Sequence, residues 1–162
     1  ILKAFCAHAS NDEYIEWFYT LKSILGDSVP VYFIQENNTL QNPFFEQVFM
    51  PMVREKNALK GENLYIRGDD RKKGDKATRI EANLEPVDRE GRLVFNEDEK
   101  DNPHMMELMD QFKMFELHLP YCADGPDCVE GGKYTIDQKM REVAATVDTV
   151  KVEELIDQRN RM

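Results

Sequence analysis

The sequence predicts an α/β domain in which helices pack on both faces of a mixed sheet. The chain has 162 residues, an ordinary length for one domain with its own core. Strand-like apolar runs alternate along it with segments whose apolar residues recur at helical spacing. The run from Val29 to Ile34 is almost continuously apolar, which is typical of a strand covered on both faces.

The first elements are a strand, a helix and a second strand. Residues Ile1 to Ala9 form the first predicted strand. Ser10 to Glu13 offers N-cap residues for a helix over Tyr14 to Leu25, and Gly26 ends that helix. The helix has apolar residues at helical spacing, at Ile15, Phe18, Leu21, Ile24 and Leu25. The apolar run from Val29 then forms the second strand.

The middle of the chain is predicted to continue the alternation. Pro43 begins a helix that Pro51 should kink, because proline lacks a donor N–H and crowds the preceding turn. Asn63 to Arg67 is a short predicted strand, Asp75 to Asn83 a short helix, and Arg92 to Phe95 another strand.

The last third is predicted to be helical. An acidic connector, Asn96 to Asn102, leads into a helix from Pro103 to Leu117. The core-facing side of that helix is expected to carry Met106, Met109, Phe112 and Phe115. Asp124 to Val143 forms the final helix of a domain that spans residues 1–143. Residues 144–162 form a charged tail, either helical, poorly ordered or an interaction arm.

The net charge and the local distribution of charge give opposite indications about nucleic-acid binding. The net charge of −10 disfavours binding to a phosphate backbone, although overall charge does not describe a local site. One segment concentrates positive charge, at Arg67, Arg71, Lys72, Lys73, Lys76 and Arg79. It is either a solvated loop or a DNA-contacting one, and the DNA-contacting interpretation assigns Arg71, Lys72, Lys73, Lys76 and Arg79 to DNA. No apolar run approaches the roughly 20 residues of a membrane helix.

Carboxylates follow a strand and begin a helix. Glu36 comes where the strand that includes Val31 to Gln35 leaves the sheet, and ligands gather at such strand ends. Asp124 and Asp127 lie on a Gly-Pro turn that opens the last helix. Each has a purely structural alternative: Glu36 as an exposed loop carboxylate, and the aspartates as helix caps that complement the dipole.

Together these residues predict a metal site. Cations of the magnesium class prefer oxygen ligands, often one or two carboxylates plus substrate phosphates. We expect Glu36 and Asp124 to be catalytic metal ligands that converge in space, with Asp127 as a further ligand or a supporting residue. Hydrolysis with two metal ions normally needs more than two carboxylates, so at least one ligand is unrecognised.

Four motifs resemble the nuclease domain of the large terminase subunits of tailed bacteriophages. Glu36-Asn-Asn-Thr-Leu-Gln41 is similar to the second acidic motif of that family, and Asp124-Gly-Pro-Asp-Cys-Val-Glu130 to the third. Between them, Lys76-Ala-Thr-Arg-Ile80 and Gly91-Arg-Leu-Val-Phe95 resemble elements of the same domains. The four occur in the family's order from about Gln35 to Gly132.

The resemblance implies a ribonuclease H-like endonuclease that cuts concatemeric double-stranded DNA during genome packaging in the host cytoplasm. It implies Mg²⁺ or Mn²⁺ as cofactor. It also implies an ATPase motor domain in the same polypeptide, with portal protein and small terminase subunit as partners. This sequence contains no Gly-x-x-x-x-Gly-Lys-Ser/Thr phosphate loop, so no ATP site is expected in it.

The sequence departs from the family pattern in two places. The first catalytic aspartate has no visible equivalent, and the chain is expected to start after that strand, so whether this fragment alone cleaves DNA stays open. Ala123 replaces the first residue of the Asp doublet found in many relatives. Two other functions stay open: another ribonuclease H-like nuclease of the resolvase or transposase type, and a non-catalytic acidic module that docks a protein partner.

Overall fold

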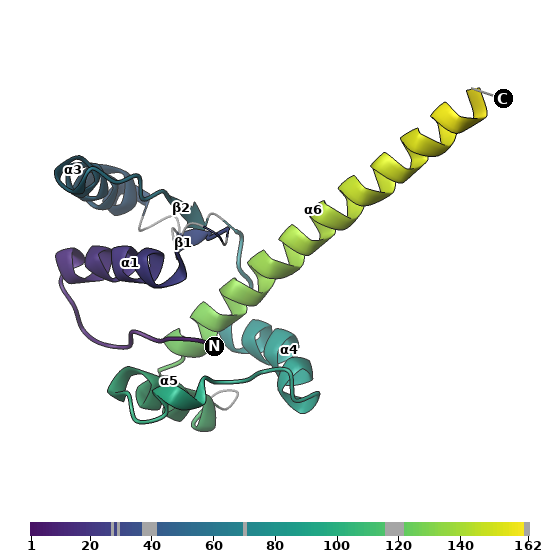
Figure 1. Cartoon of the computed structure of the whole chain (residues 1–162). Helices are drawn as coiled ribbons and strands as arrows, with labels where there is room; N and C mark the ends of the chain where they lie inside the picture. The colour runs from purple at the N-terminus through teal and green to yellow at the C-terminus, as the bar shows by residue number, and fades with distance from the viewer. Residues whose placement is uncertain (27, 29, 37–41, 70, 116–121, 161–162) are drawn as a thin grey trace. The chain divides into compact units, whose positions relative to one another are not determined.

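The computed structural model describes most of the chain, in two compact units (Figure 1). The described residues are 1–26, 28, 30–36, 42–69, 71–115 and 122–160, with the backbone alone for 42 and 147–160. Unit 2 is Phe5–Lys73, and unit 1 joins Ile1–Ala4 to Gly74–Met162.

The predicted mixed sheet with helices on both faces is wrong. The chain is mostly helical, at 64%, and its described part contains one sheet of two strands. That sheet pairs β1, Phe33–Glu36, with β2, Ile66–Asp69, in parallel. The ribonuclease H-like architecture is therefore not what the chain adopts here.

Two predicted strands have irregular backbone instead. Neither Ile1–Ala9 nor Arg92–Phe95 contains a strand. The Asn96 N–H donates to the Ile1 carbonyl at 2.9 Å and the Ile1 amino group donates to the Val94 carbonyl, but the two segments are not assigned as paired strands. Phe95 packs edge-to-face on Phe112 with the ring centroids 5.6 Å apart, so its apolar side chain serves helix packing.

Helix α1, Asn11–Leu25, confirms the predicted helix and begins three residues earlier. Ser10 is its N-cap: the Ser10 hydroxyl accepts from the Glu13 N–H, and the Glu13 carboxylate accepts from the Ser10 N–H at 2.8 Å. This reciprocal pair satisfies two backbone donors that the first turn leaves open. Gly26 ends the helix at φ +67°, a conformation that favours glycine.

A helical crossover joins the two parallel strands, as parallel pairing requires. It comprises α2, Asn42–Phe44, the π-helical segment η1, Phe45–Phe49, and α3, Met50–Lys60. The π turn immediately precedes Pro51, where the sequence predicts a disturbance. The wider turn relieves the crowding that a proline ring imposes on the turn before it.

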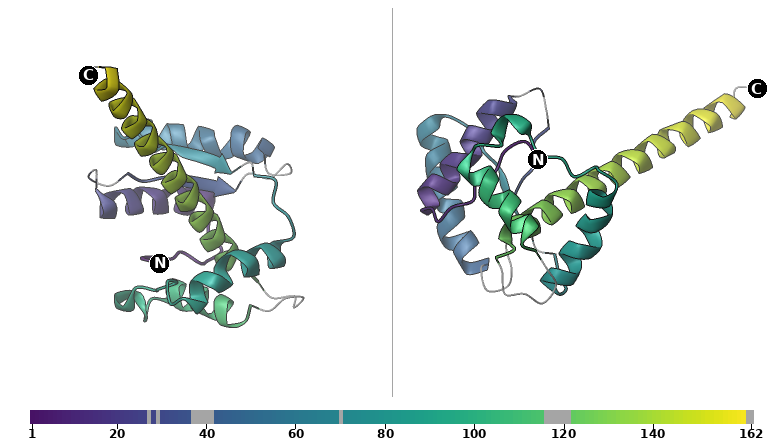
Figure 2. Two further views of the ribbon diagram at one scale, coloured as in Figure 1. Left: turned by 90° about the vertical axis from the view of Figure 1, so that its right-hand side faces the viewer. Right: turned by 90° about the horizontal axis from the view of Figure 1, so that it is seen from below.

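The core of unit 2 lies on one face of the sheet, where α1 and α3 meet β1 and β2. Phe18 of α1 packs edge-to-face on Phe33 of β1, and Tyr14 contacts Phe49. The Tyr19 hydroxyl donates to Asn57 Oδ1 at 2.8 Å. The buried cluster is Ile15, Phe18, Tyr19, Phe45, Phe49, Val53, Leu64 and Ile66. Figure 2 shows the two strands side by side with their arrowheads in the same direction.

Ion pairs fasten α1 to α3 beside this core. Lys56 Nζ lies 2.7 Å from Asp12 Oδ1 and 2.5 Å from Glu16 Oε1, and Lys60 Nζ lies 3.0 Å from Glu16 Oε2. Hydrogen bonds from Lys56, and then from Lys60, hold the pKa of Glu16 below its ordinary value.

This shifted pKa predicts an acid sensitivity of unit 2. Because the folded-state pKa of Glu16 is depressed, its stabilising effect is complete above the unfolded pKa of about 4.3 and is lost as pH falls through the folded value. We expect wild type to have a higher urea midpoint than Glu16→Gln at pH 7, and the two midpoints to converge toward pH 3. Glu55→Gln, an exposed change on α3, should give no such pH-dependent difference.

Unit 1 consists mainly of helices. They are α4, Lys76–Arg89, a 3₁₀ turn η2, Glu97–Glu99, α5, Pro103–Lys113, and α6, Asp124–Asn160. Helices α4 and α5 each pack against α6. Asp75 caps α4, because its carboxylate accepts from the Thr78 N–H at 2.9 Å.

Helix α6 has 37 residues and is a single straight rod in every view (Figures 1 and 2). The predicted domain boundary at residue 143 falls inside it. None of the helices in the described ranges is long and apolar enough to cross a membrane.

The buried side of α5 differs from the predicted one. Met105, Leu108 and Gln111 are buried, whereas Met106 is half exposed. The buried residues of α5 are therefore displaced by one position from the predicted ones. The sequence pattern did not indicate this side because one of its members, Gln111, is polar.

Candidate functional site

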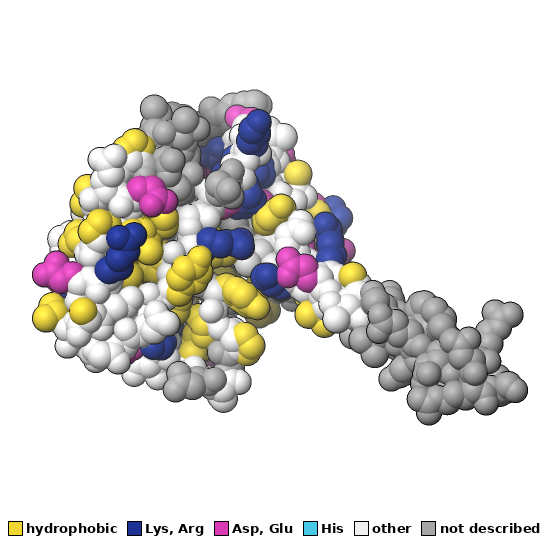
Figure 3. Space-filling model, turned by 90° about the horizontal axis from the view of Figure 1, so that it is seen from above, with side chains coloured by type: hydrophobic (Ala, Val, Ile, Leu, Met, Phe, Trp, Pro, Cys, Tyr) yellow, Lys and Arg dark blue, Asp and Glu magenta, His cyan; other side chains and the backbone are white. Residues whose placement is uncertain are grey.

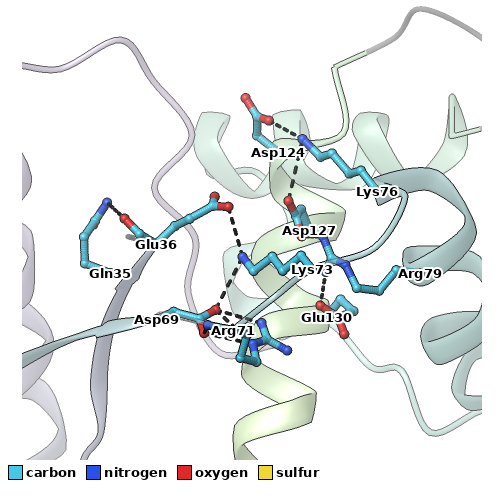
Figure 4. A network of polar contacts seen from close by, with 10 residues as sticks. All are labelled: Gln35, Glu36, Asp69, Arg71, Lys73, Lys76, Arg79, Asp124, Asp127 and Glu130. Carbon is cyan, nitrogen blue, oxygen red and sulfur yellow. Dashed lines mark hydrogen bonds and ion pairs between the residues drawn. The ribbon is translucent and has the colours of Figure 1, made fainter. Parts of the chain in front are cut away.

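Two carboxylates lie at the carboxyl ends of the paired strands in unit 2. The parallel register places Glu36 opposite Asp69, and we call these two residues the strand-end pair. Lys73 Nζ lies between them, 3.1 Å from Glu36 Oε1 and 3.4 Å from Asp69 Oδ2 (Figure 4). The pair thus holds one positive charge at the edge of a parallel sheet where ligands commonly bind.

Arg71 orients the second carboxylate of this pair. Its Nε and Nη2 donate to the two oxygens of Asp69, with distances of 2.9–3.0 Å. Burial raises the pKa of Asp69, but the hydrogen bonds from Arg71 outweigh it and the net pKa is lowered. Asp69 is therefore an ionised carboxylate with a fixed orientation, in contrast to Glu36, whose side chain is more exposed.

A second pair of carboxylates, Asp124 and Asp127, lies at the start of α6 in unit 1. We call it the helix-start pair. Lys76 Nζ lies 2.6 Å from Asp124 Oδ1 and 3.8 Å from Asp127 Oδ2 (Figure 4). The hydrogen bond from Lys76 is the main reason why the pKa of Asp124 is lowered. For Lys76 itself, desolvation lowers the pKa, but the hydrogen bond to Asp124 outweighs it and the pKa is raised.

The two members of the helix-start pair differ in exposure. The Asp124 side chain is largely exposed, and the Cys122 thiol donates to its Oδ2 at 3.6 Å. Asp127 is buried and receives a hydrogen bond of 2.7 Å from Arg79 Nη2. The accessible carboxylate is thus Asp124, while the predicted roles of Asp124 as metal ligand and of Asp127 as supporting residue stay predictions.

Arg79 links α4 to α6 through a buried polar network. Besides Asp127, it donates to Glu130, whose side chain also accepts from Asn83 Nδ2 at 3.0 Å. Glu130 is 1% exposed. A buried carboxylate is costly unless it is paired, so this network holds the first turns of α6 against α4.

Most of the predicted DNA-contacting cluster pairs with carboxylates of the chain itself. Arg71, Lys73, Lys76 and Arg79 all form ion pairs. Arg67 and Lys72 are exposed and form no ion pair or hydrogen bond with any residue that the structure describes. On the face displayed in Figure 3, basic side chains are interspersed with acidic and hydrophobic ones. Contact of this cluster with DNA stays a prediction.

The strand-end pair and the helix-start pair each supply oxygen ligands suited to a hard divalent cation, but neither supplies a complete set of ligands. Within the described residues, no three His, Cys, Asp or Glu side chains are grouped so as to hold a metal ion. The strand-end pair, however, offers carboxylate oxygens already arranged around a cationic group. Mg²⁺ is often held by one or two carboxylates, with water and phosphate oxygens completing its shell. To hold such an ion, the pair would have to release Lys73, and Asp69 would have to bind the ion through lone pairs that its hydrogen bonds from Arg71 leave available.

The predicted convergence of Glu36 and Asp124 stays a prediction, because Glu36 belongs to unit 2 and Asp124 to unit 1. Sequence reasoning missed Asp69, since it ended that strand at Arg67, two residues early. A usable signal was present: Asp69 follows an alternating run, as Glu36 follows its own strand. Two cysteines at this end of α6, Cys122 and Cys128, are exposed.

Comparison with known proteins leaves the family open. No protein-family model matches the sequence, and neither the curated proteins nor the solved structures yield a significant match. Function must therefore be argued from the carboxylates and their surroundings.

Proposed function

We propose that this chain is a divalent-metal-dependent endonuclease domain that cuts concatemeric double-stranded DNA during phage genome packaging. The observation that carries the proposal is the register of the sheet, which sets Glu36 beside Asp69 at the strand ends, with Lys73 between them and Arg71 on Asp69. The motif resemblance to terminase nuclease domains supplies the biological setting, including the host cytoplasm, the motor domain and the packaging partners. The proposal does not depend on a ribonuclease H-like sheet.

Each residue of the strand-end pair has a separate task. Glu36 and Asp69 would hold Mg²⁺ or Mn²⁺, which as a Lewis acid supplies charge stabilisation to a phosphodiester. Arg71 keeps Asp69 ionised and oriented through its two-pronged hydrogen bond. Lys73, released from the carboxylates, is positioned to neutralise a phosphate oxygen. At the helix-start pair, Lys76 and Asp124 offer the same combination of cation and accessible carboxylate.

Titration with Mn²⁺ tests this proposal directly. We expect the 162-residue chain to bind Mn²⁺, and Glu36→Gln to weaken the affinity by about tenfold or more, since even residues behind the direct ligands commonly cost 10–100-fold. Asp69→Asn should act in the same direction, and Asp124→Asn tests the helix-start pair in the same way. Binding is measured by calorimetry or by the electron paramagnetic resonance signal of free Mn²⁺.

Glu55→Gln is the matched control, because it removes one exposed carboxylate of unit 2 outside the pair. Mn²⁺-dependent nicking or linearisation of plasmid DNA should fall in the Glu36 variant and persist in the control. Absence of Mn²⁺ binding by the wild-type chain, or equal affinities of the Glu36 and Glu55 variants, would contradict the proposal.

A non-catalytic docking module is the second candidate. The net charge of −10 favours it, because acidic surfaces attract basic protein partners and repel DNA. The lysines that already neutralise both carboxylate pairs are consistent with purely structural ion pairing. This candidate predicts no specific Mn²⁺ binding, so the same titration separates the two.

A further inference from the structure

The sheet of unit 2 has two chemically different faces. Side chains alternate between the faces along a strand. Phe33 packs on Phe18 and Ile66 is buried in the core, so these positions belong to the inner face, which α1 and α3 cover. Tyr32 and Tyr65 each lie one residue before the first residue of a strand, and from the same alternation we infer that they belong to the opposite side. They are 59% and 70% exposed.

The outer face carries two in-register rows of side chains, and one tyrosine precedes each strand. Tyr32 and Tyr65 precede the first paired residues, Ile34 pairs with Arg67, and Glu36 pairs with Asp69. Neighbouring strands lie about 4.8 Å apart, and two residues advance a strand by about 6.6 Å. The tyrosines therefore lie about 13 Å from the strand-end pair, with Arg67 in between.

The composition of this face indicates a polar ligand with flat, stackable groups. A parallel sheet face that a helix covers is usually rich in Val, Ile and Leu. Here Ile34 is the single aliphatic residue among the six, and the rest combine two amphipathic rings with charges. Tyrosine is well suited to such a face, because its ring stacks while its hydroxyl stays hydrated.

Arg67 supplies charge complementarity to a phosphate. It is exposed and forms no ion pair with the described residues, in a chain whose net charge is −10. A guanidinium presents a planar array of donors that matches phosphate oxygens, and it also stacks on rings. Aromatic rings beside an available cation are the combination that binds unpaired nucleotides without sequence preference.

We propose that the outer face of the β1–β2 sheet binds a single-stranded segment of nucleic acid. Its bases stack on Tyr32 and Tyr65, Arg67 contacts a phosphate, and the strand runs toward Glu36 and Asp69. This inference rests on the proposed nuclease function and assigns to that site an unpaired DNA strand as the species it holds. Paired bases do not offer their faces for stacking, so duplex DNA is expected to bind this surface more weakly.

The test uses fluorescence anisotropy of a labelled oligothymidylate with the 162-residue chain in EDTA, where no metal-dependent cleavage occurs. We expect Tyr65→Ala and Tyr32→Ala each to weaken binding about fivefold or more, given the usual value of one stacked base. Arg67→Gln should weaken binding and reduce its salt dependence.

Two control variants separate stacking from general effects. Arg54→Gln removes an exposed cation of α3 that lies outside both the predicted DNA-contacting cluster and the six outer-face residues, and Leu59→Ala removes an exposed apolar side chain of the same helix. Both should bind as wild type does. Far-UV circular dichroism establishes that each variant is folded, and Tyr65→Phe, which keeps the ring, should retain binding.

The outcomes distinguish this inference from the proposed function. Unchanged oligothymidylate binding in both tyrosine variants, tighter binding of a matched duplex, or equal losses in the Arg67 and Arg54 variants would overturn the inference that this face binds an unpaired strand. If in that case Glu36→Gln still loses Mn²⁺ affinity, the nuclease proposal stands without it. If wild type binds oligothymidylate through the tyrosines but binds no Mn²⁺, binding of an unpaired strand is supported and the nuclease proposal fails.

Discussion

Replacing Arg79 with Met should destabilise unit 1 by about 3–5 kcal/mol, the usual cost of leaving one partner of a buried ion pair unpaired. Arg79 donates to Asp127 and to the fully buried Glu130. Methionine fills a similar volume but offers no donor, so Glu130 and Asp127 both lose their hydrogen bonds from Arg79. Urea denaturation followed by circular dichroism measures the loss.

Arg89→Met is the matched control on the same helix. Arg89 pairs with Glu85 one turn away, and both side chains are at least half exposed. Exposed pairs of this kind contribute less than about 1 kcal/mol, so this variant should unfold close to wild type. Adding Glu130→Gln to Arg79→Met should restore part of the stability, because the buried charge is then removed. Equal effects of the two arginine variants, or no recovery in the double variant, would show that the network contributes little.

Gly125→Ala should destabilise unit 1 by about 1–3 kcal/mol, the usual cost of overpacking. A Cβ at this position would collide with Leu108 Cδ1 and lie 2.8 Å from Gln111 Oε1. Both neighbours are buried in α5, so they have little room to move. The same approach lets the Gly125 N–H donate to Gln111 Oε1 at 2.8 Å, which satisfies a backbone donor in the first turn of α6.

Gly132→Ala provides a control of opposite sign in the same helix. Nothing lies within 4 Å of a Cβ built there, and the position is exposed. Alanine should therefore stabilise α6 by up to about 1 kcal/mol through its higher helix propensity. The melting temperatures of Gly125→Ala and Gly132→Ala, compared with that of wild type, test both expectations. A higher melting temperature for Gly125→Ala would mean that α5 yields readily and that the close approach is not a constraint.

Local signals predicted several elements well. The Ser10 cap and the apolar spacing after it identified α1, and Gly26 marked its end. The strand end at Glu36 and the opening of a helix at Asp124 were also predicted correctly. Each depends on capping chemistry, turn residues or apolar periodicity, which act over a few neighbouring residues.

The sheet and the partners of the charged residues were not predictable in this way. Asp69 gains its relation to Glu36 from the register of a parallel pair, which the crossover through α3 sets over more than 30 positions. Gln111 is buried because it accepts from Gly125, a contact that has no local pattern. Strands were overpredicted for a related reason: an apolar run becomes a strand only where another strand pairs with it.

The sequence by itself determined where α5 and α6 begin, where α1 ends, and which carboxylates and cations the chain has available, because these properties are local or compositional. Tertiary structure alone decided that Lys73 lies between Glu36 and Asp69, that Arg79 joins Asp127 and Glu130, and that Glu36 pairs in register with Asp69. Such pairings join residues tens of positions apart, and their electrostatic and packing energies exist only after the chain has closed those distances.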